Sequence, residues 1–164
     1  MIVPAREDVH SPFGSGTLVL ARSLPRPMVF TNGVFDLLHA GHVELIERAR
    51  RLGESLVVGV NSDASVRTLG KGRGRPITPE HDRIAVVAAL RAVSMVLSFD
   101  ESTPAALLDA LRPDVIVKGA DYTPQRWPES RQAQAWGARA IVLPLLEGRS
   151  TTATVARIRA GVER

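Results

Sequence analysis

Short apolar runs alternate with longer amphipathic segments from residue 28 to the end of this chain. The apolar runs are rich in Val and Ile, which is typical of parallel strands buried on both faces of a sheet. They lie at residues 29–31, 56–61, 95–98, 115–118 and 140–143. Segments with helical spacing follow at residues 41–52, 79–92, 104–111, 130–136 and 151–160. This alternation predicts the α/β class, with a Rossmann-like, doubly wound, parallel five-stranded sheet in a single domain.

Two of the predicted helices begin at a Thr-Pro pair, Thr78-Pro79 and Thr103-Pro104. Such a pair is expected to place a capping hydroxyl at the N-cap and a proline at the first helical position. These helices should therefore start with their threonine side chains bound to their own first turn.

The part of the chain before residue 28 lacks this alternation. It contains Gly14-Ser15-Gly16 and four prolines, Pro4, Pro12, Pro25 and Pro27. We therefore expect residues 1–27 to form an irregular N-terminal leader, in which residues 17–21 are compatible with a short strand or helix. The folded domain is expected at residues 28–164.

The composition is that of an ordinary globular domain, with 164 residues, 45% apolar and 23% charged. No apolar run approaches the roughly 20 residues of a membrane-spanning helix. Acidic residues near the start, with no apolar run beside them, argue against a signal peptide. Cysteine is absent, which excludes disulfides and thiolate sites and fits a cytoplasmic protein.

Lys and Arg exceed Asp and Glu by 21 − 17 = 4, which suits an anionic substrate, although a solvated basic surface explains it equally well. One segment, residues 69–76, is both basic and rich in glycine. Its glycines indicate mobility, and its cations indicate contact with an anion; they alternate as Gly70, Lys71, Gly72, Arg73, Gly74 and Arg75. These cations are too few to favour binding to membranes or nucleic acid.

The clearest chemistry lies in the turn at residues 31–42, which joins a predicted strand to a predicted helix. It places His39 and His42 three residues apart, on one face of a helix start, and Gly41 lets a ligand approach the backbone. Unpaired N–H groups and the positive end of the helix dipole favour phosphate there. Two imidazoles add donors for an anion that gains charge during a reaction. Surface histidines, or a metal site for which no third ligand is evident, are the alternatives.

Two other segments are expected to reach the same place. Ligands of open α/β sheets bind beyond the carboxyl ends of the strands, where the strand order reverses. In the usual order 3-2-1-4-5, this crevice lies between the first strand and the fourth, which ends at Lys118 and Asp121. The last helix begins at the hydroxyl-rich run Ser150-Thr151-Thr152, a second N-terminus suited to phosphate.

A set of motifs runs through nearly the whole chain after the leader. It comprises the His-x-Gly-His turn at residues 31–42, residues 60–65, Arg75-Pro76, and residues 80–83, 113–114, 117–122 and 150–152. These motifs resemble the HxGH nucleotidyltransferase superfamily, in its cytidylyltransferase-like branch. They are most similar to the enzymes that adenylylate D-glycero-β-D-manno-heptose 1-phosphate for lipopolysaccharide. The chain departs from that pattern at Ala120, where a second glycine is common, and in a basic loop one residue longer.

The resemblance implies a role for individual residues. It implies that the catalytic residues are His39, His42 and Lys71. It implies that the nucleotide is bound by Thr31, Asn32, Gly33, Val34, Phe35, Gly41, Lys118, Asp121, Ser150, Thr151 and Thr152. It implies that the sugar phosphate is bound by Asp36, Asn61, Asp63 and Arg83. No metal ligand is assigned among the protein residues, because Mg²⁺ is expected to come with ATP and to be held mostly by triphosphate oxygens and water.

Several of these assignments have a structural alternative. Asp36 could satisfy backbone N–H groups in its turn, and Asp63 could cap a short helix. For Arg83 the resemblance implies a phosphate or a structural role, and a surface salt bridge is the alternative. Trp127 and Trp136 are expected in the core or an interface rather than in the site.

The remaining alternatives concern the basic loop, the end of the fourth strand and the start of the last helix. Lys71 could lie in a solvated loop, and Arg73 could share its role. Lys118 could pair with Asp121 at the strand end. The hydroxyls of residues 150–152 could serve only as an N-cap, which is compatible with phosphate binding because both use the same helix start.

The implied reaction transfers AMP from ATP to D-glycero-β-D-manno-heptose 1-phosphate and gives ADP-heptose and pyrophosphate. The resemblance also implies a homodimer, with no nucleic-acid or membrane partner. A separate sugar kinase is expected upstream, because 164 residues leave no room for one. Two other hypotheses stay open: a CTP- or GTP-dependent transferase acting on another sugar, glycerol phosphate or phosphonate, and a non-catalytic nucleotide sensor or RNA-binding module. The histidine pair argues against a dead enzyme, and the 4% of aromatic residues argues against single-strand RNA binding.

Overall fold

The computed structural model describes residues 15–70, 72, 74–119, 127–145, 148 and 150–161. Its centre is a sheet of five parallel strands in the order β3-β2-β1-β4-β5. The strands are β1 Met28–Gly33, β2 Ser55–Asn61, β3 Met95–Phe99, β4 Val115–Gly119 and β5 Arg139–Leu143. The predicted strands and their predicted order are confirmed, and the crevice between β1 and β4 lies where the sequence placed it.

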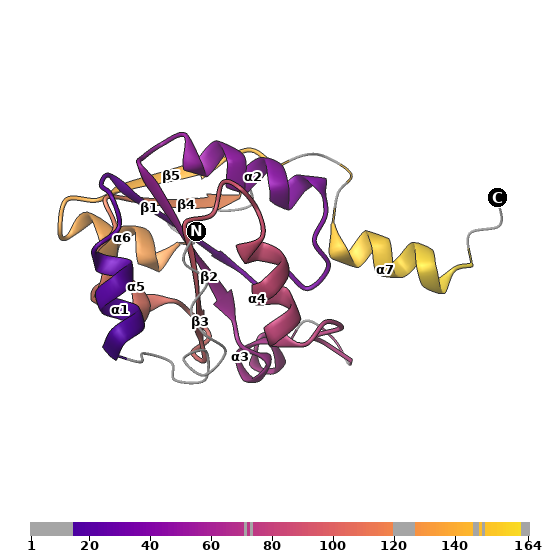
Figure 1. The fold of residues 1–164 in the computed structure, drawn as a ribbon. Helices are drawn as coiled ribbons and strands as arrows, with labels where there is room; N and C mark the ends of the chain where they lie inside the picture. Colours follow the sequence, from indigo (N-terminus) through magenta and orange to yellow (C-terminus); the bar gives the residue numbers. More distant parts are fainter. Residues whose placement is uncertain are drawn as a thin grey trace.

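Both faces of the sheet are buried, as the continuous apolar strands predict. Because side chains alternate along a strand, Met28 and Phe30 of β1 pack on one face and Val29 packs on the other. The first face is covered by α1 (Ser15–Arg22), α5 (Ala105–Leu111) and α6 (Pro128–Gln134). The second face is covered by α2 (Ala40–Arg50) and α4 (Glu80–Ala88). Helices on both sides of the sheet, visible in Figure 1, make the fold doubly wound.

Within the segment expected to be an irregular leader, residues 15–22 form helix α1, so the short strand or helix allowed at residues 17–21 is a helix. This helix belongs to the core: Ala21 is fully buried, and Leu18 and Leu24 pack against the same cluster. Arg22 Nε donates to the carbonyl of Ala110 at 2.7 Å and so ties α1 to α5. The apolar spacing in this segment was too short to distinguish a helix from a strand, and packing against α5 decides between them. Residues 1–14 lie outside the described part of the chain.

The threonine caps predicted at the starts of the helices after Thr78 and Thr103 are wrong. The N-cap residues of α4 and α5 are Pro79 and Pro104, and neither helix has a side-chain cap. The hydroxyl of Thr78 instead donates to the carbonyl of Asp36 at 2.6 Å. A contact with a residue far away in sequence has replaced the local cap that the Thr-Pro pair predicts.

Two further helices lie outside the main layers. α3 (Asp63–Thr68) follows β2 directly, and it is the short helix that the alternative role of Asp63 assumed. α7 (Thr151–Arg159) stands out from the body of the fold in Figure 1, and Ile158 on it is 70% exposed. None of the helices in the described ranges has the length and apolar character needed to span a membrane.

Candidate nucleotide-phosphate site

The carboxyl ends of β1 and β4 are joined by side chains across the crevice. Thr31 Oγ1 donates to the carbonyl of Val117 at 3.1 Å, and Lys118 Nζ donates to Asn32 Oδ1 at 2.6 Å. Thr31 is buried, and Asn32 and Lys118 are half-buried at the opening. Two residues predicted to bind the nucleotide, Asn32 and Lys118, are therefore in direct contact although they are far apart in sequence.

The turn after β1 brings the two predicted histidines together. His39 is the N-cap residue of α2, and the backbone N–H of His42 donates to its carbonyl at 2.9 Å. The imidazole rings stack with centroids 3.8 Å apart and planes inclined by 18°. The Nδ1 atom of each ring is enclosed by protein, so a ligand would have to approach the rings from their other edge. The two imidazoles therefore lie against each other at the N-terminus of α2.

Phe35 holds this turn in shape. Its φ is 51°, a left-handed value that is uncommon for an aromatic residue. Its ring is only 5% exposed and meets the ring of His42 edge to face, with centroids 5.2 Å apart. A Cβ on Gly33 would lie 3.2 Å from the same ring, which explains the glycine at the end of β1. Core packing of Phe35 thus maintains a strained backbone next to the histidines.

The start of α7 reaches the same turn. Ser150 caps this helix by accepting a hydrogen bond from the backbone N–H of Ala153 at 3.0 Å. Thr151 Oγ1 donates to the carbonyl of Leu37, two residues before His39, at 3.3 Å. The expected convergence of the last helix on the histidine turn is therefore present. We call this junction, formed by residues 36–42 and 150–152, the two-helix corner.

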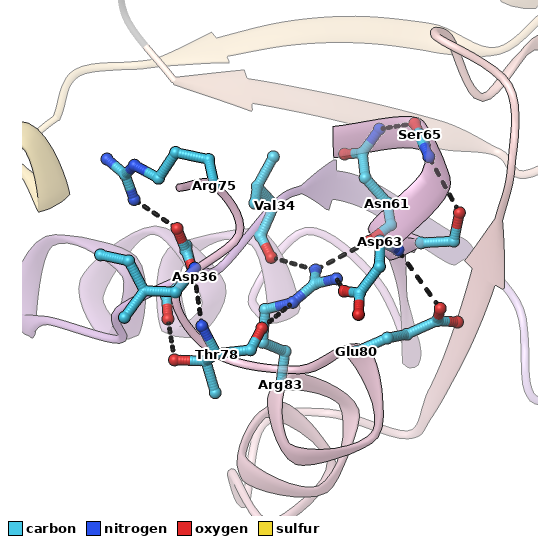
Figure 2. Close-up of polar contacts among 11 residues, drawn as sticks. Val34, Asp36, Asn61, Asp63, Ser65, Arg75, Thr78, Glu80 and Arg83 are labelled. Carbon is cyan, nitrogen blue, oxygen red and sulfur yellow. Dashed lines mark hydrogen bonds and ion pairs between the residues drawn. The ribbon is translucent and has the colours of Figure 1, made fainter. Parts of the chain in front are cut away.

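Asp36 lies in this corner but faces the protein, as Figure 2 shows. Its side chain is almost fully buried, accepts backbone N–H groups of Ile77 and Thr78 at 2.7 and 2.9 Å, and forms an ion pair with Arg75. The resemblance implied that Asp36 binds substrate, and the alternative was that it satisfies backbone donors. The geometry favours this alternative, because the side chain accepts backbone N–H groups. These donors belong to residues 77–78 and not to the turn that contains Asp36.

Arg83 is the most deeply buried charged side chain of the site. Only 1% of the residue is exposed, and its guanidinium makes four hydrogen bonds. Nε donates to the carbonyl of Thr78, Nη1 to the carbonyls of Val34 and Asn61, and Nη2 to the carboxylate of Asp63, at 3.0, 2.7, 2.7 and 2.7 Å (Figure 2). The arginine is enclosed and directed at protein, which agrees with the structural role and not with a surface salt bridge.

Asn61 and Asp63 belong to the same network. Asn61 is 4% exposed, and its side chain donates to Ser65 Oγ at 3.0 Å. The cap of α3 is Ser62, whose Oγ accepts from the backbone N–H of Ser65, so Asp63 is not the N-cap residue that the alternative proposed. The side chain of Asp63 keeps 29% exposure while it pairs with Arg83. Among the described residues predicted to bind the sugar phosphate, all therefore have protein partners.

Three of the residues predicted for the site cannot be located, whereas both tryptophans can. Lys71, Arg73 and Asp121 lie outside the described residues. Trp127 is 3% exposed in the core, and Trp136 Nε1 donates to the carbonyl of Pro113 at 3.1 Å, as expected for residues without a site role. Within the part of the chain that the structure describes, no group of three His, Asp or Glu side chains could hold a metal ion.

Sequence reasoning placed Arg75 among the loop cations expected to contact an anion but gave it no individual role, and the structure places it beside Asp36. The signal was present as the Arg75-Pro76 motif, but the partner lies 39 residues away and no spacing rule predicts it.

The parallel doubly wound sheet, with a histidine pair at the start of α2, defines a Rossmann-like α/β protein. Residues 30–152 match the family described as Cytidylyltransferase-like. A D-beta-D-heptose 1-phosphate adenylyltransferase of Bordetella bronchiseptica is 53% identical over 87% of this chain and 88% of that protein. The chain belongs to the cytidylyltransferase-like family of nucleotidyltransferases, as its motifs predicted.

Longer relatives and solved structures agree with this. The Bifunctional protein HldE of Acidiphilium cryptum is 55% identical over 79% of this chain, and that of Streptomyces coelicolor is 56% identical over 82%. The matched region spans only 26% and 29% of those two proteins. A lipopolysaccharide core biosynthesis protein from Thermoplasma volcanium has a TM-score of 0.62 and 27% identity, covering 74% of this chain and 98% of that one. A pantothenate synthetase from Thermus thermophilus, with a TM-score of 0.58 and 18% identity, covers 85% of this chain and 69% of its own and supports the fold alone.

The contacts of Arg83 predict that it is required for stability. Replacing it in Arg83→Met should lower the free energy of unfolding by about 3–5 kcal/mol, because Asp63 and three carbonyls lose their donor. Urea denaturation followed by circular dichroism measures this. Arg67→Met, at an exposed position of the neighbouring helix α3, is the control and should change the value by less than about 0.5 kcal/mol. Equal stability of the two variants would refute the role assigned to Arg83.

Proposed function

We propose that this protein transfers AMP from ATP to D-glycero-β-D-manno-heptose 1-phosphate, giving ADP-heptose and pyrophosphate. The observation that carries the reaction class is the stacked pair His39/His42 at a helix start, joined to the start of α7 through Thr151. The substrates are taken from the name of the Bordetella bronchiseptica relative, which matches most of both chains.

In this reaction a phosphate oxygen of the sugar 1-phosphate attacks the α-phosphorus of ATP in line. A new P–O bond forms, and the P–O bond to the β-phosphate breaks as pyrophosphate leaves with its electron pair. No covalent enzyme intermediate is required, so the protein contributes positioning and charge stabilisation. His39, His42 and the N–H groups of two helix starts are directed at the charge that builds up on the phosphates.

Magnesium is proposed to enter as MgATP, as part of the substrate. The described residues offer no three-ligand cluster, and the carboxylate of Asp36 already accepts protein donors. Mg²⁺ commonly keeps several waters and binds phosphate oxygens, so such a complex needs few protein ligands. Lys71 is proposed to contribute a cation to the same phosphates.

The acceptor sugar 1-phosphate has to be made by a kinase, which we propose is a separate polypeptide. The Bordetella bronchiseptica relative, which has a similar length, is named only as an adenylyltransferase. The proteins named bifunctional carry most of their length outside the matched region. We place both reactions in the cytoplasm, where ATP is available.

Removing one imidazole should abolish most of the activity. In His42→Ala, kcat for pyrophosphate release is expected to fall about 10²–10³-fold, the effect of deleting one donor to a charged transition state. His81→Ala is the control, because His81 is an exposed residue of α4 with its side chain 73% exposed. Turnover that survives in His42→Ala would contradict the catalytic role and would favour a nucleotide-binding module.

The preference of the enzyme for one nucleotide base is a second test, because the names of the relative and of the family imply different bases. The Bordetella bronchiseptica relative is named an adenylyltransferase, whereas the family is described as cytidylyltransferase-like. We expect ATP to support pyrophosphate release with heptose 1-phosphate at least about tenfold better than CTP or GTP, a difference of about 1.4 kcal/mol. Release measured with each nucleotide at equal concentration tests this. A preference for CTP would overturn the substrate assignment and leave the reaction class intact.

We also propose a homodimer. β5 lies at the edge of the sheet; Val142 in this strand is 36% exposed, and Leu145 just after it is 41% exposed. Apolar side chains at an open edge are commonly covered by another chain. Light scattering coupled to size exclusion should give twice the 17.7 kDa of one chain. The mass of a single chain at micromolar concentration would contradict the proposal.

A further inference from the structure

Arg75 is the described cation of the basic loop, and it is held close to the two-helix corner. One Nη1–H donates to Asp36, whose other carboxylate oxygen accepts the backbone N–H groups of Ile77 and Thr78. The same carboxylate therefore fixes both the head of Arg75 and the chain that follows it. A side chain fixed at both ends loses little freedom when it binds a ligand.

Most of the hydrogen-bonding capacity of Arg75 is unused by the described residues. A guanidinium has five N–H donors, and the contact with Asp36 is the one hydrogen bond of Arg75 within the described chain. Only 14% of the side chain is exposed, so much of the guanidinium is removed from water. Arg83 is the contrast in the same region, because it is more deeply buried and makes four hydrogen bonds to protein. A largely buried guanidinium with free donors indicates an anionic ligand.

The surroundings of Arg75 indicate which anion this is. Asp36 is followed by Leu37, whose carbonyl accepts from Thr151 at the start of α7, and then by His39 at the start of α2. Figure 2 shows the guanidinium of Arg75 directed away from the Arg83 network. An anion in the corner would therefore meet two helix N-termini, two imidazoles and one guanidinium.

We infer that Arg75 binds a phosphate oxygen of the nucleotide triphosphate, and that Asp36 is its positioning residue rather than a substrate ligand. This inference rests on the proposed function, because it takes the triphosphate as the ligand of the corner. Guanidinium groups bind phosphate through parallel N–H donors, and the donors of Arg75 that Asp36 does not use supply such a pair. The charge of Asp36 does not oppose the phosphate, since Arg75 and two backbone N–H groups balance it.

Two variants at this position separate charge from geometry. Arg75→Gln can keep a donor to Asp36 but loses the charge, and it should weaken binding of inorganic tripolyphosphate about tenfold to a hundredfold in calorimetry. The KM for ATP should rise by a similar factor. Arg75→Lys restores the charge without the planar fork and should recover part of the loss.

The matched control is Arg26→Gln. Arg26 also pairs with an aspartate, Asp114, but at the opposite ends of the strands, before β1 and β4. Its variant should leave tripolyphosphate binding unchanged. Thermal unfolding of every variant shows whether the ion pair of Arg75 with Asp36 also contributes to stability. A purely structural role of Arg75 predicts a loss of stability with no loss of tripolyphosphate binding.

The outcomes separate this inference from the proposed function. If the wild type makes ADP-heptose and Arg75→Gln keeps its affinity for tripolyphosphate and its KM for ATP, the phosphate role is refuted, whatever happens to stability. If the wild type binds tripolyphosphate through Arg75 but transfers no AMP, the proposed reaction fails and the phosphate site stands. The inference is supported if Arg75→Gln loses affinity for tripolyphosphate, Arg75→Lys recovers part of it and Arg26→Gln keeps all of it.

Discussion

The buried guanidinium of Arg83 is the contact on which the shape of the site depends. It binds the chain after β1 at Val34, the end of β2 at Asn61, the start of α3 at Asp63 and the chain before α4 at Thr78. Each of these segments leaves the sheet at its carboxyl edge, where loops would otherwise be held only by their own turns. Asp36 also binds residues 77 and 78, so hydrogen bonds link the histidine turn to the entrance of α4 and make the two one unit. Buried donors and acceptors give this unit one geometry, since an alternative arrangement would leave several of them unpaired.

The sheet could be predicted from the sequence because its causes are local and repeated. Val- and Ile-rich runs at regular intervals, separated by helical patterns, allow few folds other than a parallel doubly wound sheet. The same reasoning left α1 undecided between a strand and a helix, because α1 is short and depends on packing of Ala21 and Arg22 against α5. It failed at Thr78, where the local rule predicted a cap and the hydroxyl binds Asp36 instead. In both cases a tertiary contact determined what propensity left undecided.

The candidate site was predictable in outline and not in its partners. The histidine pair, the crevice and the start of α7 follow from motif and topology, and the structure brings them together. The roles of Asp36, Asp63 and Arg83 do not follow, because a charged residue near a site can face the ligand or the protein. The side-chain partners of Asp36 and Asp63 lie between 20 and 42 residues away in the chain, and Arg83 binds Val34 at a separation of 49 residues, beyond the reach of any spacing rule. For Lys71 and Asp121, which lie outside the described residues, the motif remains the only guide.

Arg75 and Arg83 each neutralise one carboxylate, which explains how Asp36 can lie next to a phosphate site. An isolated Asp36 would repel a triphosphate, and at a few ångströms in a partly buried site this costs several kcal/mol. Two backbone N–H groups and Arg75 compensate that charge, while Arg83 binds Asp63 and so compensates the second nearby carboxylate. With both carboxylates balanced by protein, the helix starts, the imidazoles and the remaining donors of Arg75 determine the field at the corner. The positive field then comes from fixed groups that need no rearrangement when charge develops on the phosphates, which is the condition under which electrostatic stabilisation is most effective.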